Sequence, residues 1–102
     1  MLNRILLAFL FSFSFSADLF ISEVAEGSSN NKYIEIFNAG DNDVDLSAYS
    51  LSSCSNGCDV DGEWDYPNNV TFESNDAILQ PGDVYVVCHQ SADQTILDEC
   101  NQ

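Results

Sequence analysis

The chain has 102 residues, enough for one domain at most, and its seventeen acidic side chains against two basic ones give a formal net charge of −15. So acidic a surface repels the phosphate backbone, which proteins bind through Lys and Arg, and direct nucleic-acid binding is therefore not expected. Disorder is not expected either, because Ile, Val, Leu, Phe and Tyr recur throughout in strand-like patterns.

Residues 1–16 have the pattern of a secretory signal peptide. Arg4 gives a positive start, Ile5 to Phe15 a short apolar core, and Ser14-x-Ser16 a small-residue cleavage pattern. A membrane anchor is the alternative, but eleven residues reach roughly 16 Å as a helix, short of the ~30 Å hydrocarbon core. We therefore expect a secreted chain of residues 17–102 with no membrane span.

The first two strands are expected on either side of a polar turn. DLFISEV (18–24) is the first, and KYIEIFN (32–38) is the second, with Ile34 and Ile36 on one face and Tyr33, Glu35 and Phe37 on the other. The turn is the candidate binding loop, formed by Glu26, Gly27, Ser28, Ser29, Asn30, Asn31 and Lys32. Small polar residues favour chain reversal there, and a binding loop is the alternative. A phosphate loop would be followed by a helix, whereas a strand follows here.

The middle of the chain is expected to add weaker strands. A second polar turn, AGDNDV (39–44), leads into a third strand region, DLSAYSLSS (45–53), with Tyr49 and Leu51 on one face. EWDY and NVTFE are then two further strands around Pro67.

The last part combines a turn, a strand and a helix. LQPGD (79–83) predicts a type II turn, since Pro81 sets the first corner and Gly82 allows the positive φ. VYVVC (84–88) is the next strand. A helix is expected over 92–99, with Ser91 and Gln94 as a capping box.

The pattern is that of an all-β sandwich with one short helix near the C-terminus. We find about six strands where a closed sandwich of this type has about seven. We therefore expect residues 17–102 to lack the last strands of the domain and to expose a sheet edge.

The four cysteines predict two disulfides, because the chain is short and carries a secretory leader. Three connectivities are possible. We favour Cys54–Cys58, which closes a tight turn, and Cys88–Cys100, which attaches the helix to its strand. A four-cysteine zinc site is the alternative, and an oxidising compartment argues against it.

The acidic segment after Cys58 holds the best metal candidate. Asp59, Asp61, Glu63 and Asp65 alternate and could offer oxygen ligands to calcium. An EF-hand loop that began at Asp59 would need glycine at its sixth position and glutamate at its twelfth. Gly62 is instead the fourth residue and Val70 the twelfth, so a solvated acidic strand is the expectation. Trp64 and Tyr66 share a face; we expect them in the core, with stacking on sugar rings as the alternative.

Catalytic residues are not expected. His89, the only histidine, follows a strand beside Cys88, and no nucleophile motif surrounds any serine. Paired carboxylates for glycoside hydrolysis stay open, since their spacing is invisible in sequence. Asn69-Val70-Thr71 is the only sequon, which makes Asn69 a glycosylation candidate.

LFISEVAEGSSNNKYIEIFN resembles the opening of a lamin tail domain of the secreted bacterial and algal type. Leu46-x-x-Tyr49-x-Leu51 and Leu79-x-Pro81-Gly82-Asp83 before VYVV match as well, and the resemblance covers Asp18 to Leu97. It implies an immunoglobulin-like sandwich without an active site that binds or tethers, sometimes beside secreted nucleases or phosphatases. The family's later strands are absent, so the copy looks C-terminally truncated. No catalytic domain accompanies it, so nuclease chemistry is not carried over.

The resulting expectation is a secreted, acidic, disulfide-bonded module that binds or tethers a protein or extracellular surface, without a cofactor. The alternatives are an accessory domain of a secreted hydrolase whose catalytic part is absent here, and a calcium-dependent adhesion module. A fragment without a function of its own is a third possibility.

Overall fold

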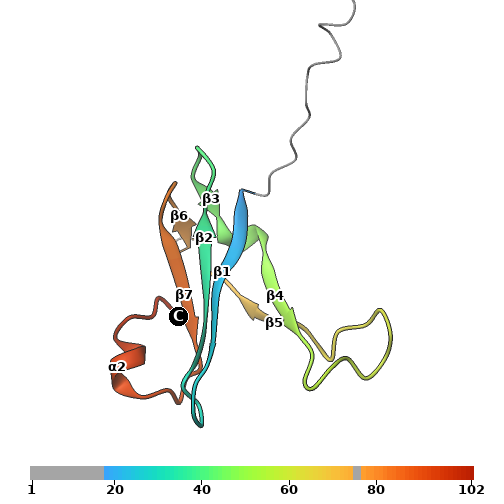
Figure 1. Ribbon diagram of the computed structural model, residues 1–102. Coiled ribbons are helices and arrows are strands. Elements are labelled where there is room, and N and C mark those ends of the chain that lie inside the picture. Colours follow the sequence, from blue (N-terminus) through green and yellow to red (C-terminus); the bar gives the residue numbers. More distant parts are fainter. Residues whose placement is uncertain (1–17, 75–76) are drawn as a thin grey trace, which may run out of the picture.

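The computed structural model describes residues 18–74 and 77–102, so the leader predicted over 1–16 lies outside the described residues. Antiparallel strands make up most of this part of the chain, as expected (Figure 1). The strands are β1 (Leu19–Glu26), β2 (Lys32–Asn38), β3 (Val44–Asp45), β4 (Ser50–Ser53), β5 (Tyr66–Thr71), β6 (Ile78–Leu79) and β7 (Val84–Cys88). The helices are η2 (Leu46–Ala48) and α2 (Gln94–Leu97). None of the helices in the described ranges is long and apolar enough to cross a bilayer.

One layer of the immunoglobulin-like fold is the sheet β1-β2-β7. Its central strand, β2, follows the predicted alternation: Ile36 is buried, and Ile34 packs at the margin of the same core. The register joins Ile36 to Ile21 on β1 and to Tyr85 on β7. The opposite face of the sheet carries Tyr33, Glu35 and Phe37, because successive side chains of a strand alternate between faces.

The ladders β3-β6 and β4-β5 contribute the rest of the core. Leu46, Phe72, Ala77 and Leu79 are buried against Ile36 and Tyr85. The rings of Phe72 and Tyr85 meet edge to face, with centroids 5.5 Å apart. The core therefore lies where β6 and η2 face the sheet, whereas the β4-β5 hairpin diverges from β1 toward the opposite end (Figure 1).

The strand region predicted over 45–53 is interrupted by a 3-10 turn, η2, which separates β3 from β4. Asp45 begins this turn: its Oδ1 accepts hydrogen bonds from the Ser47 amide at 3.0 Å and the Ser47 hydroxyl at 2.7 Å. Both bonds lower the pKa of Asp45. The turn directs Leu46 fully into the core and leaves Tyr49 52% exposed, so Tyr49 and Leu51 do not act as one buried face.

Of the two strands predicted around Pro67, NVTFE overlaps β5 and EWDY is wrong. One strand, β5, runs through Pro67. Proline is tolerated there because β5 lies at the edge of its two-stranded ladder, where a missing N–H breaks no pairing. The predicted Pro-Gly turn is confirmed: Gly82 has φ +81°, and the Asp83 amide donates to the Gln80 carbonyl at 3.1 Å.

The C-terminal helix is shorter than the predicted 92–99, and its capping box is wrong. Asp93 is the N-cap residue, without a side-chain cap bond, and Gln94 donates forward to Asp98 at 2.8 Å. Ser91 lies outside the helix, where its amide donates to His89 Nδ1. Tertiary contacts decide this end of the helix, because the Asp93 side chain bonds to the β1-β2 loop instead of capping its own helix.

Asn38, the last residue of β2, is fully buried and polar. Its Nδ2 donates to the carbonyls of Asn42 at 2.8 Å and Leu79 at 2.9 Å, and its Oδ1 accepts from the Gly40 amide at 3.0 Å. One side chain therefore joins β2, the turn that follows it and β6. Every buried side-chain polar atom of the described residues has a partner.

Candidate functional site

The candidate binding loop is a compact turn between β1 and β2. The Gly27 amide donates to the Asn31 carbonyl at 2.8 Å, and the Asn31 amide donates to Ser28 at 3.1 Å. Ser29 adopts φ +58°, and a Cβ on Gly27 would meet the Asn31 oxygen at 2.6 Å. Glu26 and Lys32 face one another in the register, and the Lys32 amide donates to Asn30. The polar run thus satisfies its own backbone groups, which is the structural role expected from its composition.

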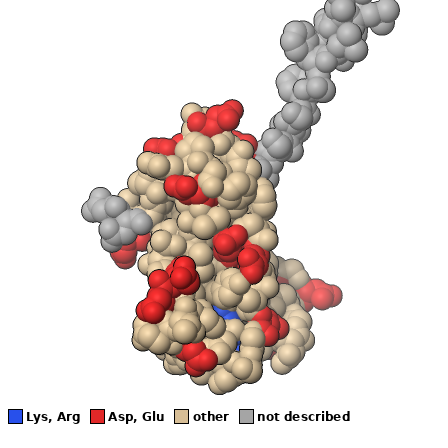
Figure 2. All heavy atoms as spheres, turned by 60° about the vertical axis from the view of Figure 1, so that its left-hand side comes forward, with Lys and Arg blue, Asp and Glu red and all other residues tan. Residues whose placement is uncertain are grey.

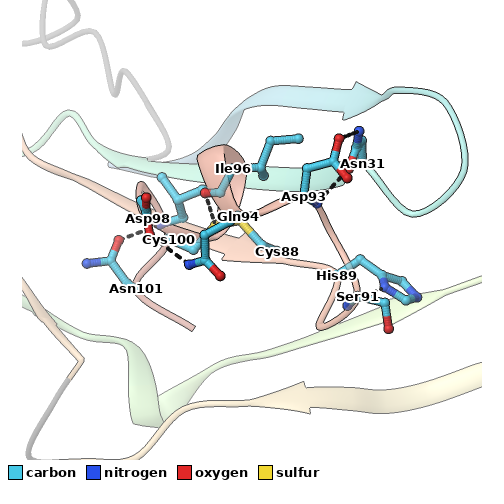
Figure 3. The surroundings of a disulfide bond; sticks show 11 residues. Asn31, Cys88, His89, Ser91, Asp93, Gln94, Ile96, Asp98, Cys100 and Asn101 are labelled. Carbon is cyan, nitrogen blue, oxygen red and sulfur yellow. Dashed lines mark hydrogen bonds between the residues drawn. A yellow bond between two sulfur atoms is a disulfide. The ribbon is translucent and has the colours of Figure 1, made fainter.

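Asn31 connects this loop to the C-terminal segment. Its Nδ2 donates to Asp93 Oδ2, and its Oδ1 accepts from the Asp93 amide, both at 2.8 Å (Figure 3). The two residues are 62 positions apart in the sequence. No pattern in either segment indicates this pair, and only the tertiary structure shows that the loop holds the start of α2.

The disulfides join Cys54 to Cys58 and Cys88 to Cys100, the pairing favoured from the sequence. Cys88–Cys100 connects β7 to the end of the α2 segment (Figure 3). Beyond it the chain returns along β7: Cys88 N–H donates to the Gln102 carbonyl at 2.8 Å, and Asn101 N–H donates to Val86 at 2.9 Å. The outer edge of β7 is therefore occupied at Val86 and Cys88.

The segment 54–65 projects from the sandwich between β4 and β5 (Figure 1). Asp65 organises it: Oδ2 accepts from the Ser55 amide at 3.0 Å, and Oδ1 accepts from the Asp59 amide at 2.9 Å. The bond from Asp59, followed by that from Ser55, lowers the pKa of Asp65. Both carboxylate oxygens of Asp65 thus accept a hydrogen bond from a backbone amide of the segment. In residues 18–74 and 77–102, Asp59, Asp61 and Glu63 form no metal-binding group with Asp65.

Replacing Asp65 tests this organisation. Asp65→Asn keeps one acceptor oxygen and loses the charge, so we expect faster amide exchange at Ser55 and Asp59 and a small fall in Tm. Because the folded pKa is lowered, the stabilisation is complete above the ordinary value of 3.8 and is lost as the pH falls below it. The difference from wild type should therefore vanish in strong acid. Asp61→Asn is the matched control, and equal effects of both variants would contradict the assignment.

Trp64 and Tyr66 are not in the core, contrary to the prediction. They are 60% and 53% exposed, respectively. The disulfide-closed segment before them carries the chain away from the two layers, so their side chains do not reach the cluster around Leu46. Both aromatic rings instead belong to the accessible surface.

His89 and Asn69 are both exposed. The Nδ1 atom of His89 accepts from the Ser91 amide at 3.0 Å, which uses one ring nitrogen for a local turn. With its amide nitrogen facing the backbone carbonyls, Asn69 donates to Leu51 at 3.0 Å and Tyr66 at 3.1 Å. These contacts give each residue a local structural role.

A hollow of about 330 Å³ lies on the outer face of the sheet, between β7 and α2. Its lining includes Tyr33, Val86, Ile96, Glu35 and Glu99. The Tyr33 hydroxyl donates to Glu23, and this bond is the main cause of a raised Tyr33 pKa; burial and the charges of Glu23 and Glu35 add to it. The alternation of β2 predicts that Tyr33 and Glu35 lie on this face, but it does not predict that α2 lines the hollow beside them.

Acidic side chains are spread over the visible surface, with one small basic area among them (Figure 2). Lys32 is the sole Lys or Arg in the described ranges. Carboxylates therefore set the potential of the surface, and a basic partner fits it better than an acidic one.

Comparison with known protein families matches residues 14–101 to the lamin tail domain. No curated protein and no solved structure matches the chain.

Proposed function

The chain belongs to the lamin tail domain family, and we propose that it is a secreted, non-catalytic module. In this proposal it tethers the protein that carries it to another protein on an extracellular surface. An immunoglobulin-like domain of this family is of a kind often involved in interactions and not typically catalytic. The observation that carries the proposal is its exposed apolar surface. Large apolar side chains stay accessible on the core-facing side of β1, at Ile21 and Val24, and at Tyr49, which lines the same hollow as Ile21. Exposed apolar groups gathered in this way are typical of interaction sites.

Two further features support an extracellular location. Both cysteine pairs are bonded, and disulfides persist in oxidising compartments. The sequence of residues 1–16 has the pattern of a cleavable leader. The calcium-dependent alternative has less support, since the described residues hold no group of three or more His, Cys, Asp or Glu side chains placed to bind a metal ion.

A reporter fusion tests the proposal. The full chain, with its own leader, is fused to a fluorescent protein and produced in a secreting host, beside the reporter carrying the leader alone. We expect a mature N-terminus at Ala17 and a larger cell-surface fraction for the fusion than for the reporter. A fusion that keeps residues 1–16 in the membrane fraction would contradict secretion. Complete release into the medium would contradict tethering.

A further inference from the structure

The outer edge of β1 is unpaired in the described residues. β1 pairs with β2 from Leu19 to Glu26, with a register shift between Ile21 and Glu23, and the sheet order β1-β2-β7 of the described residues places no strand on its other side. The opposite edge of the sheet differs, because Asn101 and Gln102 bond to β7 there. An unpaired edge strand of eight residues is a template for adding a further strand.

Beside this edge the two layers are not packed together. Ile21 and Val24 pair with Ile36 and Ile34, which places them on the core side of the sheet, yet they are 48% and 62% exposed. The divergence of the β4-β5 hairpin from β1 explains their exposure (Figure 1). We call the region around Ile21 and Val24, where the β4-β5 hairpin leaves the core side of β1 partly uncovered, the β1 wedge.

Two hollows follow the β1 wedge. One of about 150 Å³ lies at Ile21, with Leu51 and Phe72 across from it. The other, of about 350 Å³, lies at Val24, with Val70 across from it. Both are lined mainly by apolar side chains from the two layers. Alternate apolar side chains of an inserted strand would therefore bury apolar surface that is now exposed to solvent.

The outer face beside the same edge is acidic. Glu23 and Glu35 are register partners there, and Ser22 Oγ donates to Glu35 Oε1 at 2.8 Å. A second copy would bring a like-charged strand against this face, since the chain has a net charge of −15. Electrostatics therefore favours an occupant with Lys or Arg at the positions that face outward.

We propose that the open β1 edge and the β1 wedge bind an extended basic segment of a partner protein, added to the sheet as a strand. Its apolar side chains, two residues apart, fill the wedge beside Ile21 and Val24, and its intervening Lys or Arg side chains lie beside Glu23 and Glu35. This inference rests on the proposed tethering function and names the surface and the partner chemistry for it.

The test uses a labelled, end-capped peptide of seven alternating lysines and valines and the full chain as a secreting host delivers it. Fluorescence anisotropy measures the affinity. Val24→Lys places a charge in the wedge, and we expect it to weaken binding about tenfold, equivalent to about 1.4 kcal/mol. Val60→Lys is the matched control, since Val60 is 54% exposed in the distant 54–65 segment, and its affinity should stay at the wild-type level.

Methylated peptides distinguish strand pairing from charge attraction. One version is N-methylated on its valines and another on its lysines, and only one of these two sets of amides can face β1. We expect one version to bind and the other to fail, with slower amide exchange along β1 in the bound state. Equal binding of both versions, or of a block peptide of the same composition, would overturn the proposal. A dimer that competes with the peptide would also overturn it, by assigning the edge to a second copy.

The reporter fusion separates the two hypotheses. Loss of surface retention with Val24→Lys, but not with Val60→Lys, supports the assignment of the edge. Equal retention of both variants overturns that assignment and leaves the tethering function standing. A wild-type fusion that is not retained, while the peptide binds as expected, refutes tethering and leaves the strand-binding edge in place.

Discussion

Asn38→Ala is expected to lower the free energy of unfolding by about 3 kcal/mol, because a fully buried side chain loses three hydrogen bonds at once. The carbonyls of Asn42 and Leu79 lose a donor, and the Gly40 amide loses an acceptor. Asn38 itself is fully buried, so water cannot replace the amide without entering the core. Urea unfolding followed by circular dichroism measures the loss from the midpoint, provided that the slope is unchanged.

Asn42→Ala is the control for this variant. Asn42 is exposed and contributes its backbone carbonyl to the network, which alanine retains. Its unfolding midpoint should therefore stay close to that of wild type. Equal midpoints for the two variants would show that the Asn38 side chain does not hold the turn and β6 together.

Removing the Cys88–Cys100 bridge, with Cys88→Ala and Cys100→Ala together, is expected to cost roughly 3 kcal/mol. The bridge closes a loop with a sequence separation of 12, and α2 has only four residues, too few to persist alone. Without it, the segment is held by the Asn31–Asp93 pair and by the bonds of Asn101 and Gln102 to β7. Thermal unfolding gives the cost, and amide exchange over 94–100 shows where the order is lost.

The pair Cys54→Ala and Cys58→Ala is the matched control. Its loop has a sequence separation of 4, so the expected cost is smaller, at roughly 2 kcal/mol. It should leave amide exchange over 94–100 unchanged, because the 54–65 segment projects away from α2 (Figure 1). If both pairs loosened 94–100 equally, the local attachment of α2 by Cys88–Cys100 would be refuted.

The candidate site was only partly predictable from the sequence. Cys88 and Cys100 could be paired because a strand and a helix near one another in the chain leave few ways to join four cysteines. The turn at 26–32 could be recognised from its small polar residues. Its link to Asp93 could not, because a hydrogen bond across 62 positions leaves no periodic trace in either segment. The β1 wedge was not predicted either. Ile21 and Val24 are three positions apart and share a face only because the register shifts between Ile21 and Glu23, and the divergence of the β4-β5 hairpin leaves both exposed.

The sequence by itself determined the elements whose signals are local. Alternation defined β2 and β7, Pro81-Gly82 defined the turn between β6 and β7, and the charge balance made the surface acidic. Each of these depends on steric limits of the backbone or on the residues' own chemistry, which act over a few positions. Tertiary structure alone decided that Leu46 enters the core from a 3-10 turn, that Trp64 stays in water, and that Asp93 bonds to Asn31. Burial and long-range pairing depend on which layers meet in space, and the same local pattern is compatible with either outcome.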